Sequence, residues 1–297
     1  MYELLIKNAT VIDGTGKPGF AAAVACESGK LKVLSPDCDC EAAKVIDGSG
    51  LYLTPGFIDP HSHGDVPLGR HFNSVSKLSQ GITTHVTGQC GFSMFPVDPA
   101  RLKPMQDGMA IFTDSFPAEM ETFTSFENYL KYVSTLKLPE NVKFNVGHVS
   151  LRIAAMGFDN RKPTAEELEK MKSMLREAME HGAIGLSSGL IYIPSVYADT
   201  EEFVELCKVV AEYDGIYTTH MRNEGDDVLK SIEESIEVGR RSGCRVHISH
   251  LKVCGQKNWG LSQKIVEMIK QAQQEGIRVS ADQYPYTASM THLNVCI

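Results

Sequence analysis

A repeated unit places the strongest constraint on how this chain can fold: a helix with a periodic apolar face ends at a glycine, and a short β-branched strand follows at once. One such helix is predicted from Thr164, where Glu167 completes a capping box, and it ends at Gly182 before a strand over 183–186. Three further glycines end predicted helices directly before strands: Gly215, Gly243 and Gly276. Alternating helices and strands with short connections predict a parallel sheet.

Earlier strands raise the number of these units to seven. They are predicted at Phe57, over 82–86 and over 142–146. A spacing of roughly 30 residues favours a TIM-type (β/α)8 barrel over an open, doubly wound sheet. Eight strands are needed to close such a barrel, so residues beyond Ile297 or a partner chain would have to complete it.

The first fifty or so residues follow a different pattern. Short strand-like runs are broken by turn signals at Asp13-Gly14-Thr15-Gly16 and at Ser28-Gly29. We therefore predict an α/β protein with a small, partial β-sandwich-like domain over 1–54. The barrel, incomplete at its C-terminus, would occupy 55–297.

Composition excludes several kinds of partner. The formal net charge of -8 argues against a nucleic-acid surface, and neither a basic run nor a long apolar run predicts a membrane contact. Eight scattered cysteines do not resemble a disulfide framework, and no secretory segment is recognisable. These features predict a reduced, cytoplasmic protein.

Side chains suited to metal binding fall at the ends of the predicted strands. His61 and His63 close the first strand and point the same way from an extended segment. Cys90, His220 and His250 follow strands two, five and six. The carboxyl ends of barrel strands form one rim, so these five residues should converge. Thiolate and imidazole ligands select zinc over magnesium or calcium, and dispersed ligands are typical of a catalytic site.

Each of these residues has a simpler structural explanation when it is taken alone, as a hydrogen-bonded histidine or a packed thiol. Only their convergence favours a metal. The strand parity of His85 and His247 is opposite to that of the neighbouring candidates, so we predict that both face the helical layer. His71 and His181 fall in predicted helices at the surface, while His148, which ends strand three, remains unassigned.

The segment Pro-Gly-Phe-Ile-Asp-Pro-His-Ser-His at 55–63 resembles the metal signature of the amidohydrolase superfamily. Further motifs along the whole chain resemble the N-acyl-D-amino acid deacylases, or D-aminoacylases. They are Gly-Gln-Cys-Gly-Phe-Ser at 88–93, Gly-His-Val-Ser-Leu-Arg at 147–152, Thr-His-Met-Arg at 219–222, Ile-Ser-His-Leu-Lys at 248–252 and Asp-Gln-Tyr-Pro-Tyr at 282–286. Related hydantoinases carry a bridging, carboxylated lysine after strand four, and the segment 185–189 has no lysine.

The resemblance implies a set of metal ligands. Cys90, His220 and His250 would hold the tighter Zn²⁺ ion, and His61 and His63, sharing Cys90, would form a weaker second site.

The resemblance also implies substrate-binding residues. Lys252 and Tyr192 would bind the carboxylate and carbonyl of the substrate, with Ser289 nearby. Arg152, after strand three, is a second candidate for the carboxylate with weaker support.

The family's general base, an aspartate on the eighth strand, would lie beyond Ile297. Asp282 is more consistent with a structural or supporting role, and Asp59 could orient His61. Since a positioned acid–base group supplies about 10²–10⁴ in rate, this chain alone should be poorly active.

The resemblance thus implies zinc-dependent hydrolysis of small N-acyl-D-amino acids to a carboxylate and a free D-amino acid. One alternative is a cyclic-amide hydrolase of the hydantoinase or dihydropyrimidinase kind. Another is a truncated, non-catalytic, metal-binding remnant.

Overall fold

The computed structural model describes residues 1–65, 68, 75–110, 113 and 115–291. The chain divides into two compact units, Met1–Phe57 and Ile58–Ile297, whereas the sequence placed the boundary after Thr54. His71, one of the histidines assigned above to a surface helix, lies outside the described residues.

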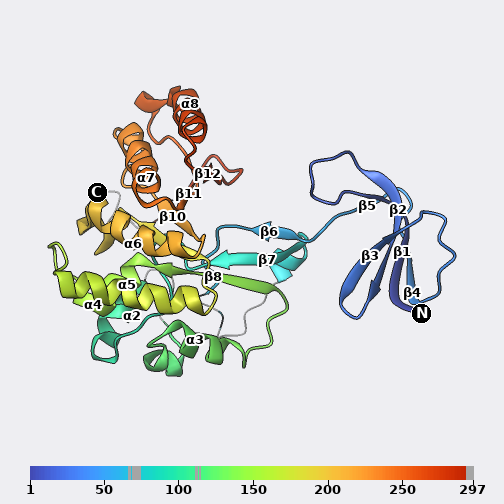
Figure 1. Cartoon of the computed structure of the whole chain (residues 1–297), viewed down its shortest axis with the longest axis horizontal. Coiled ribbons are helices and arrows are strands. Elements are labelled where there is room, and N and C mark those ends of the chain that lie inside the picture. Colours follow the sequence, from blue (N-terminus) through green and yellow to red (C-terminus); the bar gives the residue numbers. More distant parts are fainter. Residues whose placement is uncertain (66–67, 69–74, 111–112, 114, 292–297) are drawn as a thin grey trace. The chain divides into compact units, whose positions relative to one another are not determined.

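The N-terminal unit is a five-stranded sheet, blue in Figure 1. Its strands are β1 (Tyr2–Val11), β2 (Phe20–Glu27), β3 (Lys30–Leu34), β4 (Ala42–Asp47) and β5 (Tyr52–Leu53). The order is β3-β2-β1-β4, with β5 also pairing with β1. The sequence pattern predicts two short strands, over 2–6 and 10–12, separated by a turn signal at Asn8, whereas β1 is continuous. The strand has an irregularity between Ile6 and Ala9, where Asn8 has a φ of 62°, and it continues past this point.

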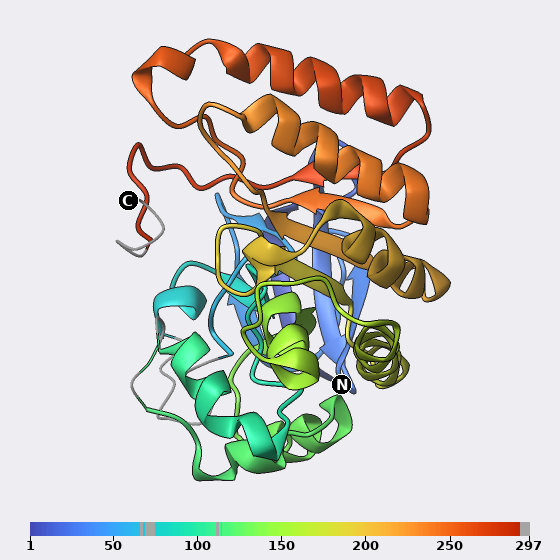
Figure 2. The ribbon, with the colours of Figure 1, turned by 90° about the vertical axis from the view of Figure 1, so that its left-hand side faces the viewer.

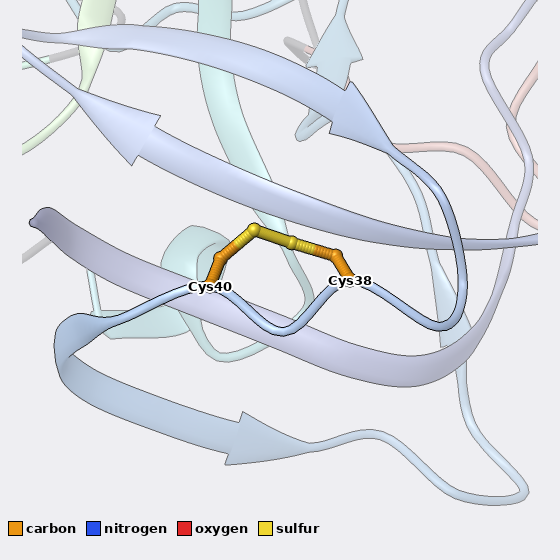
Figure 3. The surroundings of a disulfide bond; sticks show 2 residues. All are labelled: Cys38 and Cys40. Carbon is orange, nitrogen blue, oxygen red and sulfur yellow. A yellow bond between two sulfur atoms is a disulfide. The ribbon is translucent and has the colours of Figure 1, made fainter.

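A disulfide joins Cys38 and Cys40 in the loop between β3 and β4 (Figure 3). The two Cα atoms lie 5.4 Å apart, which is within the range that a disulfide spans. The sequence analysis, which found no disulfide framework in the scattered cysteines, did not predict this pair. Among the other described cysteines, Cys26, Cys90, Cys207 and Cys244 are free thiols.

The larger unit is built on a seven-stranded sheet whose strands follow one another in chain order. They are β6 (Phe57–Asp59), β7 (Ile82–Thr87), β8 (Asn141–Gly147), β9 (Gly185–Gly189), β10 (Ile216–His220), β11 (Arg245–Ile248) and β12 (Val279–Ala281). The pairings from β7 to β12 are parallel. Seven strands in chain order, each joined to the next through at least one helix, form the curved sheet of the predicted barrel, with about seven of its eight strands present.

Helices cover one face of this sheet, and α5 to α8 pack one against the next in chain order (Figure 2). The helices are α1 (Val75–Leu78), α2 (Leu102–Met109), α3 (Phe126–Val133), α4 (His148–Met156), α5 (Ala165–Glu180), α6 (Thr200–Glu212), α7 (Val228–Ser242) and α8 (Leu261–Gln274). Leu186 and Val246 from the strands are fully buried in one apolar core with Phe203 and Ile232 from the helices. No helix in the described part of the chain is long and apolar enough to cross a membrane.

Local sequence signals set the helix ends. Thr164 and Glu167 form the predicted capping box of α5, and the side chain of Asp199 accepts from the backbone of Glu202 at the start of α6. Gly243 ends α7 with a φ of 76°, the left-handed conformation that favours glycine.

We expect Glu167→Gln to lower the melting temperature more at neutral pH than in acid. The Arg161 guanidinium, 2.6 Å and 2.7 Å from the Glu167 oxygens, and the backbone of Thr164 outweigh the effect of burial and lower the pKa of Glu167 to about 2. A depressed pKa stabilises the fold above the ordinary value, 4.5, and that stabilisation is lost as the pH falls through about 2. The difference in melting temperature between the two proteins should therefore narrow from pH 4.5 to pH 2. A constant difference over this range would contradict the assignment, and exposed Glu166, as Glu166→Gln, provides the matched control.

Candidate metal centre

The five predicted metal ligands come together beyond the carboxyl ends of the strands. The sulfur of Cys90 lies 3.3 Å from Nε2 of His61 and 3.7 Å from Nε2 of His250. The rings of His220 and His250 are 4.4 Å apart between centroids, and those of His61 and His63 are 5.6 Å apart. Residues separated by almost two hundred positions therefore form one cluster, as the shared rim of parallel strands predicts.

Two of these residues sit on turns with unusual backbone geometry. Cys90 has a φ of 53° and His250 a φ of 38°, conformations that cost a non-glycine residue of order 1–3 kcal/mol. The turn before Cys90 includes Gly88, where an added Cβ would collide with the backbone carbonyl of Asn145. These turns direct both side chains into the cluster instead of continuing the strands.

Gln89 fixes the Cys90 turn against its neighbours. Its amide nitrogen donates to the carbonyl oxygen of Pro60 at 2.8 Å, next to His61, and its oxygen accepts from Oγ1 of Thr218 at 2.9 Å. The segments that carry a histidine and the thiol are thus joined directly, with a further link to β10.

The electrostatics of the cluster favour an ionised thiol. Burial of Cys90 opposes ionisation, but the imidazoles of His220, His250, His61 and His63 outweigh it and hold the pKa of the thiol well below its usual value. Burial likewise opposes the charge on His61, yet Asp282 and Cys90 raise its pKa to about 10. A thiolate surrounded by imidazoles is a soft donor set of the kind that binds zinc.

The geometry of the cluster also fits a divalent metal. One ligand atom from each of His61, Cys90 and His250 lies within 4.8 Å of the others, and the same holds for His220, Glu224 and His250. Both ring nitrogens of His220 are buried and make no hydrogen bond of normal geometry with the described residues. A buried polar group without such a bond requires an explanation, and metal coordination supplies one.

Two carboxylates support the cluster from outside. Asp282 accepts from the backbone N–H of His250 at 2.6 Å and lies 2.8 Å from Nε2 of His247 and 3.5 Å from Nδ1 of His61. Glu224 lies 3.0 Å from Nδ1 of His250. Sequence reasoning missed Glu224; the available signal was its position four residues after His220, in the loop that leaves β10.

Asp59 plays a different part from the one expected. Its carboxylate accepts from the backbone N–H of His61 at 3.1 Å and pairs with Lys77. It therefore holds the turn that carries His61, while Asp282 faces the imidazole.

The prediction that His247 faces the helical layer is wrong. Val246 and Ile248 are fully buried in the core shared with the helices, and His247 lies on the other face of β11 with Asp282. The parity argument failed because the strand ends at Ile248 and the left-handed turn at His250 breaks the alternation of side chains.

The other histidines have structural surroundings. His85 is buried and bonds Ser62 at 3.2 Å, and His181 is exposed at the end of α5. His148 opens α4, where its ring is fully buried 2.6 Å from Oγ of Ser195.

Arg152, the second candidate for the substrate's carboxylate, does not reach the cluster. Its side chain is fully buried, with Nη1 donating to Glu202 at 2.8 Å and Nη2 donating to the carbonyl oxygen of Arg161 at 2.8 Å. That candidate is therefore wrong, because the side chain is buried and both Nη groups of its guanidinium are already bonded inside the protein.

A cavity of about 720 Å³ opens beside the cluster. His63, Cys90, His220 and His250 line it, together with the three residues predicted to bind substrate: Tyr192, Lys252 and Ser289. The Tyr192 hydroxyl lies 3.0 Å from Oγ1 of Thr291, and the Lys252 ammonium lies 5.7 Å from the centre of the Tyr284 ring. The cavity thus brings the candidate metal ligands together with hydroxyl groups and a cation.

The chain belongs to the amidohydrolase family, whose model matches residues 44–292. It is 38% identical over 296 residues to the D-aminoacylase of Alcaligenes xylosoxydans xylosoxydans, covering 98% of this chain and 59% of that protein. It is 36% identical over 294 residues to the N-acyl-D-aspartate deacylase of the same organism, covering 99% and 58%. The chain therefore spans about three-fifths of the length of these curated relatives.

The solved structures agree with the sequence comparison. The N-acyl-D-glutamate deacylase from Bordetella bronchiseptica, complexed with zinc and a phosphonate inhibitor, matches with a TM-score of 0.87 at 34% identity over 96% of this chain and 59% of that one. A D-hydantoinase from a Bacillus species shares the fold at a TM-score of 0.60 and 16% identity, covering 95% and 57%. The resemblance to the D-aminoacylases is thus confirmed, and the hydantoinases are more distant.

Proposed function

We propose that this protein hydrolyses the amide bond of N-acyl-D-amino acids in a zinc-dependent reaction, releasing a carboxylate and a free D-amino acid. The observation that carries the proposal is the Cys90–histidine cluster, which opens directly onto a cavity containing Lys252. The names of the similar deacylases support this substrate class. The cytoplasmic location predicted from the sequence stays a prediction.

The metal would be held by this chain's own soft ligands. Cys90, His220 and His250 are proposed to bind one Zn²⁺ tightly, with His61 and His63 sharing Cys90 in a weaker second site. When bound, zinc would polarise the acyl carbonyl and acidify a water molecule. Asp282, which contacts His61 and the backbone of His250, would keep these two ligands in place.

Lys252, Tyr192 and Ser289 would bind and orient the substrate. In a protein with a formal net charge of -8, a carboxylate ligand needs a local cation, and the Lys252 ammonium faces the cavity. The hydroxyl of Tyr192 would hydrogen-bond the acyl carbonyl, with Ser289 nearby. Together they would hold the amide beside the thiol and imidazoles.

A general base would have to be added to these residues. Glu224 is the one carboxylate among the described residues that line the cavity, and it is already paired with Lys252 and His250. We propose that an aspartate base and the eighth strand come from residues outside 1–297 or from a partner chain.

The protein as its own cells produce it should release free amino acid from N-acetyl-D-amino acids faster than from their L-enantiomers. An amine-reactive fluorophore would measure the product, with neutral and acidic side chains compared. Removal of zinc by a chelator should stop the reaction, and added zinc should restore it. Equal rates for both enantiomers would contradict the proposed stereochemistry. Opening of a hydantoin ring in place of linear amide cleavage would favour the cyclic-amide alternative.

A further inference from the structure

Two histidines that contact the Cys90 sulfur, His61 and His250, are oriented in the same way. Each presents Nε2 to the sulfur, at 3.3 Å for His61 and 3.7 Å for His250. Each also presents Nδ1 to a carboxylate, which is Asp282 at 3.5 Å for His61 and Glu224 at 3.0 Å for His250. A neutral imidazole carries one proton, and the carboxylate beside Nδ1 of His250 favours a proton on that nitrogen, which leaves the Nε2 lone pair available to a metal. Nδ1 of His61 is buried and makes no hydrogen bond of normal geometry with the described residues.

Glu224 makes a second contact that Asp282 lacks. The oxygen facing His250, Oε1, also accepts from the ammonium of Lys252. The side chains of Glu224 and Lys252 are each only 15% exposed, so the pair is largely removed from water. One carboxylate oxygen thus lies between a proposed metal ligand and the proposed substrate-binding cation.

Glu224 is poorly placed to be a ligand of the ion that Cys90 and Nε2 of His250 would hold. Its oxygen is 3.9 Å from Nε2 of His220 and lies on the Nδ1 side of His250, away from Cys90. The ammonium of Lys252 contacts that oxygen and would repel a second cation. It also lies 2.9 Å from Nδ1 of His250, and because an ammonium can only donate, it favours a lone pair on Nδ1 and so competes with Glu224 for this nitrogen. The geometry therefore favours a positioning role.

We propose that Glu224 is a positioning residue that couples the metal site to the substrate site. Through His250 it fixes the tautomer that binds metal, and through Lys252 it holds the ammonium in the cavity. The second half of this inference rests on the proposed function, because it takes Lys252 as the group that binds the substrate's carboxylate.

The first test measures zinc affinity by competition with a chromogenic chelator, and needs no substrate. Glu224→Ala should weaken zinc binding by about 10–100-fold, because no acceptor then holds the proton on Nδ1. Glu224→Gln keeps the size and an acceptor oxygen but loses the charge, so its affinity should fall by about fivefold. Glu205→Gln is the matched control, because Glu205 pairs with Lys172 at 2.9 Å on the helical layer.

Native zinc affinity in a folded Glu224→Ala protein, with an unchanged circular dichroism spectrum, would overturn the proposal. If that variant does not fold, Glu224→Gln decides: native affinity overturns the inference, and a loss absent from the Glu205→Gln control supports it.

The second test asks whether Glu224 and Lys252 act together on substrate. Lys252→Met in the native background leaves an unpaired carboxylate facing the substrate's own carboxylate, which adds repulsion to the lost attraction. The factor by which Lys252→Met lowers kcat/KM for an N-acetyl-D-amino acid should therefore be at least about fivefold smaller in a Glu224→Gln background than in the native background. Additive losses would overturn the link to Lys252. Absence of hydrolysis by the unaltered protein would instead refute the proposed function, and the zinc titration would still test the role at His250.

Discussion

Cys90→Ala is expected to remove tightly bound zinc and to lower the rate of N-acyl-D-amino acid hydrolysis by at least about 10³-fold. A catalytic metal contributes several kcal/mol of transition-state stabilisation, and each 1.36 kcal/mol is a factor of ten in rate. Cys90 is the one thiol in a cluster whose other proposed ligands are imidazoles, and both proposed sites share it. Zinc content by elemental analysis and initial rates on the same preparation would check the result.

Cys207→Ala is the appropriate control for Cys90→Ala. Cys207 is also a fully buried free thiol, but it belongs to the apolar core on α6. This variant should keep the native zinc content, and any effect of the substitution should be a decrease in the free energy of unfolding. A Cys90→Ala protein that bound zinc as tightly as the native protein would exclude the proposed site. If Cys90→Ala lost its zinc but the native protein showed no hydrolytic activity, the result would support the alternative of a non-catalytic, metal-binding remnant.

Arg152→Leu should destabilise the larger unit by about 3–5 kcal/mol, as expected when one partner of a buried ion pair is removed. Glu202, which accepts a hydrogen bond from the Arg152 guanidinium, is only 4% exposed. It also lies 2.9 Å from Nε2 of His148. Without Arg152, that carboxylate would be left in the interior beside a single imidazole. Urea unfolding followed by far-ultraviolet circular dichroism would measure the change.

Arg161→Leu separates the effect of burial from the effect of losing a salt bridge. Arg161 also pairs with a carboxylate, Glu167, but its side chain is 42% exposed. Exposed ion pairs contribute about 0–1 kcal/mol to stability, so Arg161→Leu should lower the free energy of unfolding by an amount within that range. Equal decreases in the free energy of unfolding for Arg152→Leu and Arg161→Leu would show that burial adds nothing to the contribution of the Arg152 ion pair.

Much of the fold follows from signals local to each element. The capping box at Thr164 and Glu167 and the left-handed glycine at Gly243 act within one turn of their helices, so they are visible without tertiary information. The start of α7 was less well predicted. The sequence pattern predicts a helix over 226–242, whereas α7 begins at Val228 without a side-chain cap.

The gathering of the five proposed metal ligands was predictable for a topological reason. Parallel strands present their carboxyl ends to one rim, so a residue's place at a strand end locates it without knowledge of its contacts. Side chains beyond the strand ends could not be placed in this way. Glu224 lies in a loop, Arg152 lies on a helix that turns it into the core, and His247 was misassigned because parity was counted through a turn.

The sequence by itself determined the order of the βα units, the helix ends and the residues that meet at the rim, because these depend on periodicity, capping and chain direction. Only the tertiary structure decided which atom faces which: Nε2 of His250 toward Cys90, Nδ1 toward Glu224, and Arg152 toward Glu202 instead of the cavity. The physical reason is range. Backbone signals act over a few residues, whereas hydrogen bonds and ion pairs between loops depend on ångström-scale positions that only the packed core fixes.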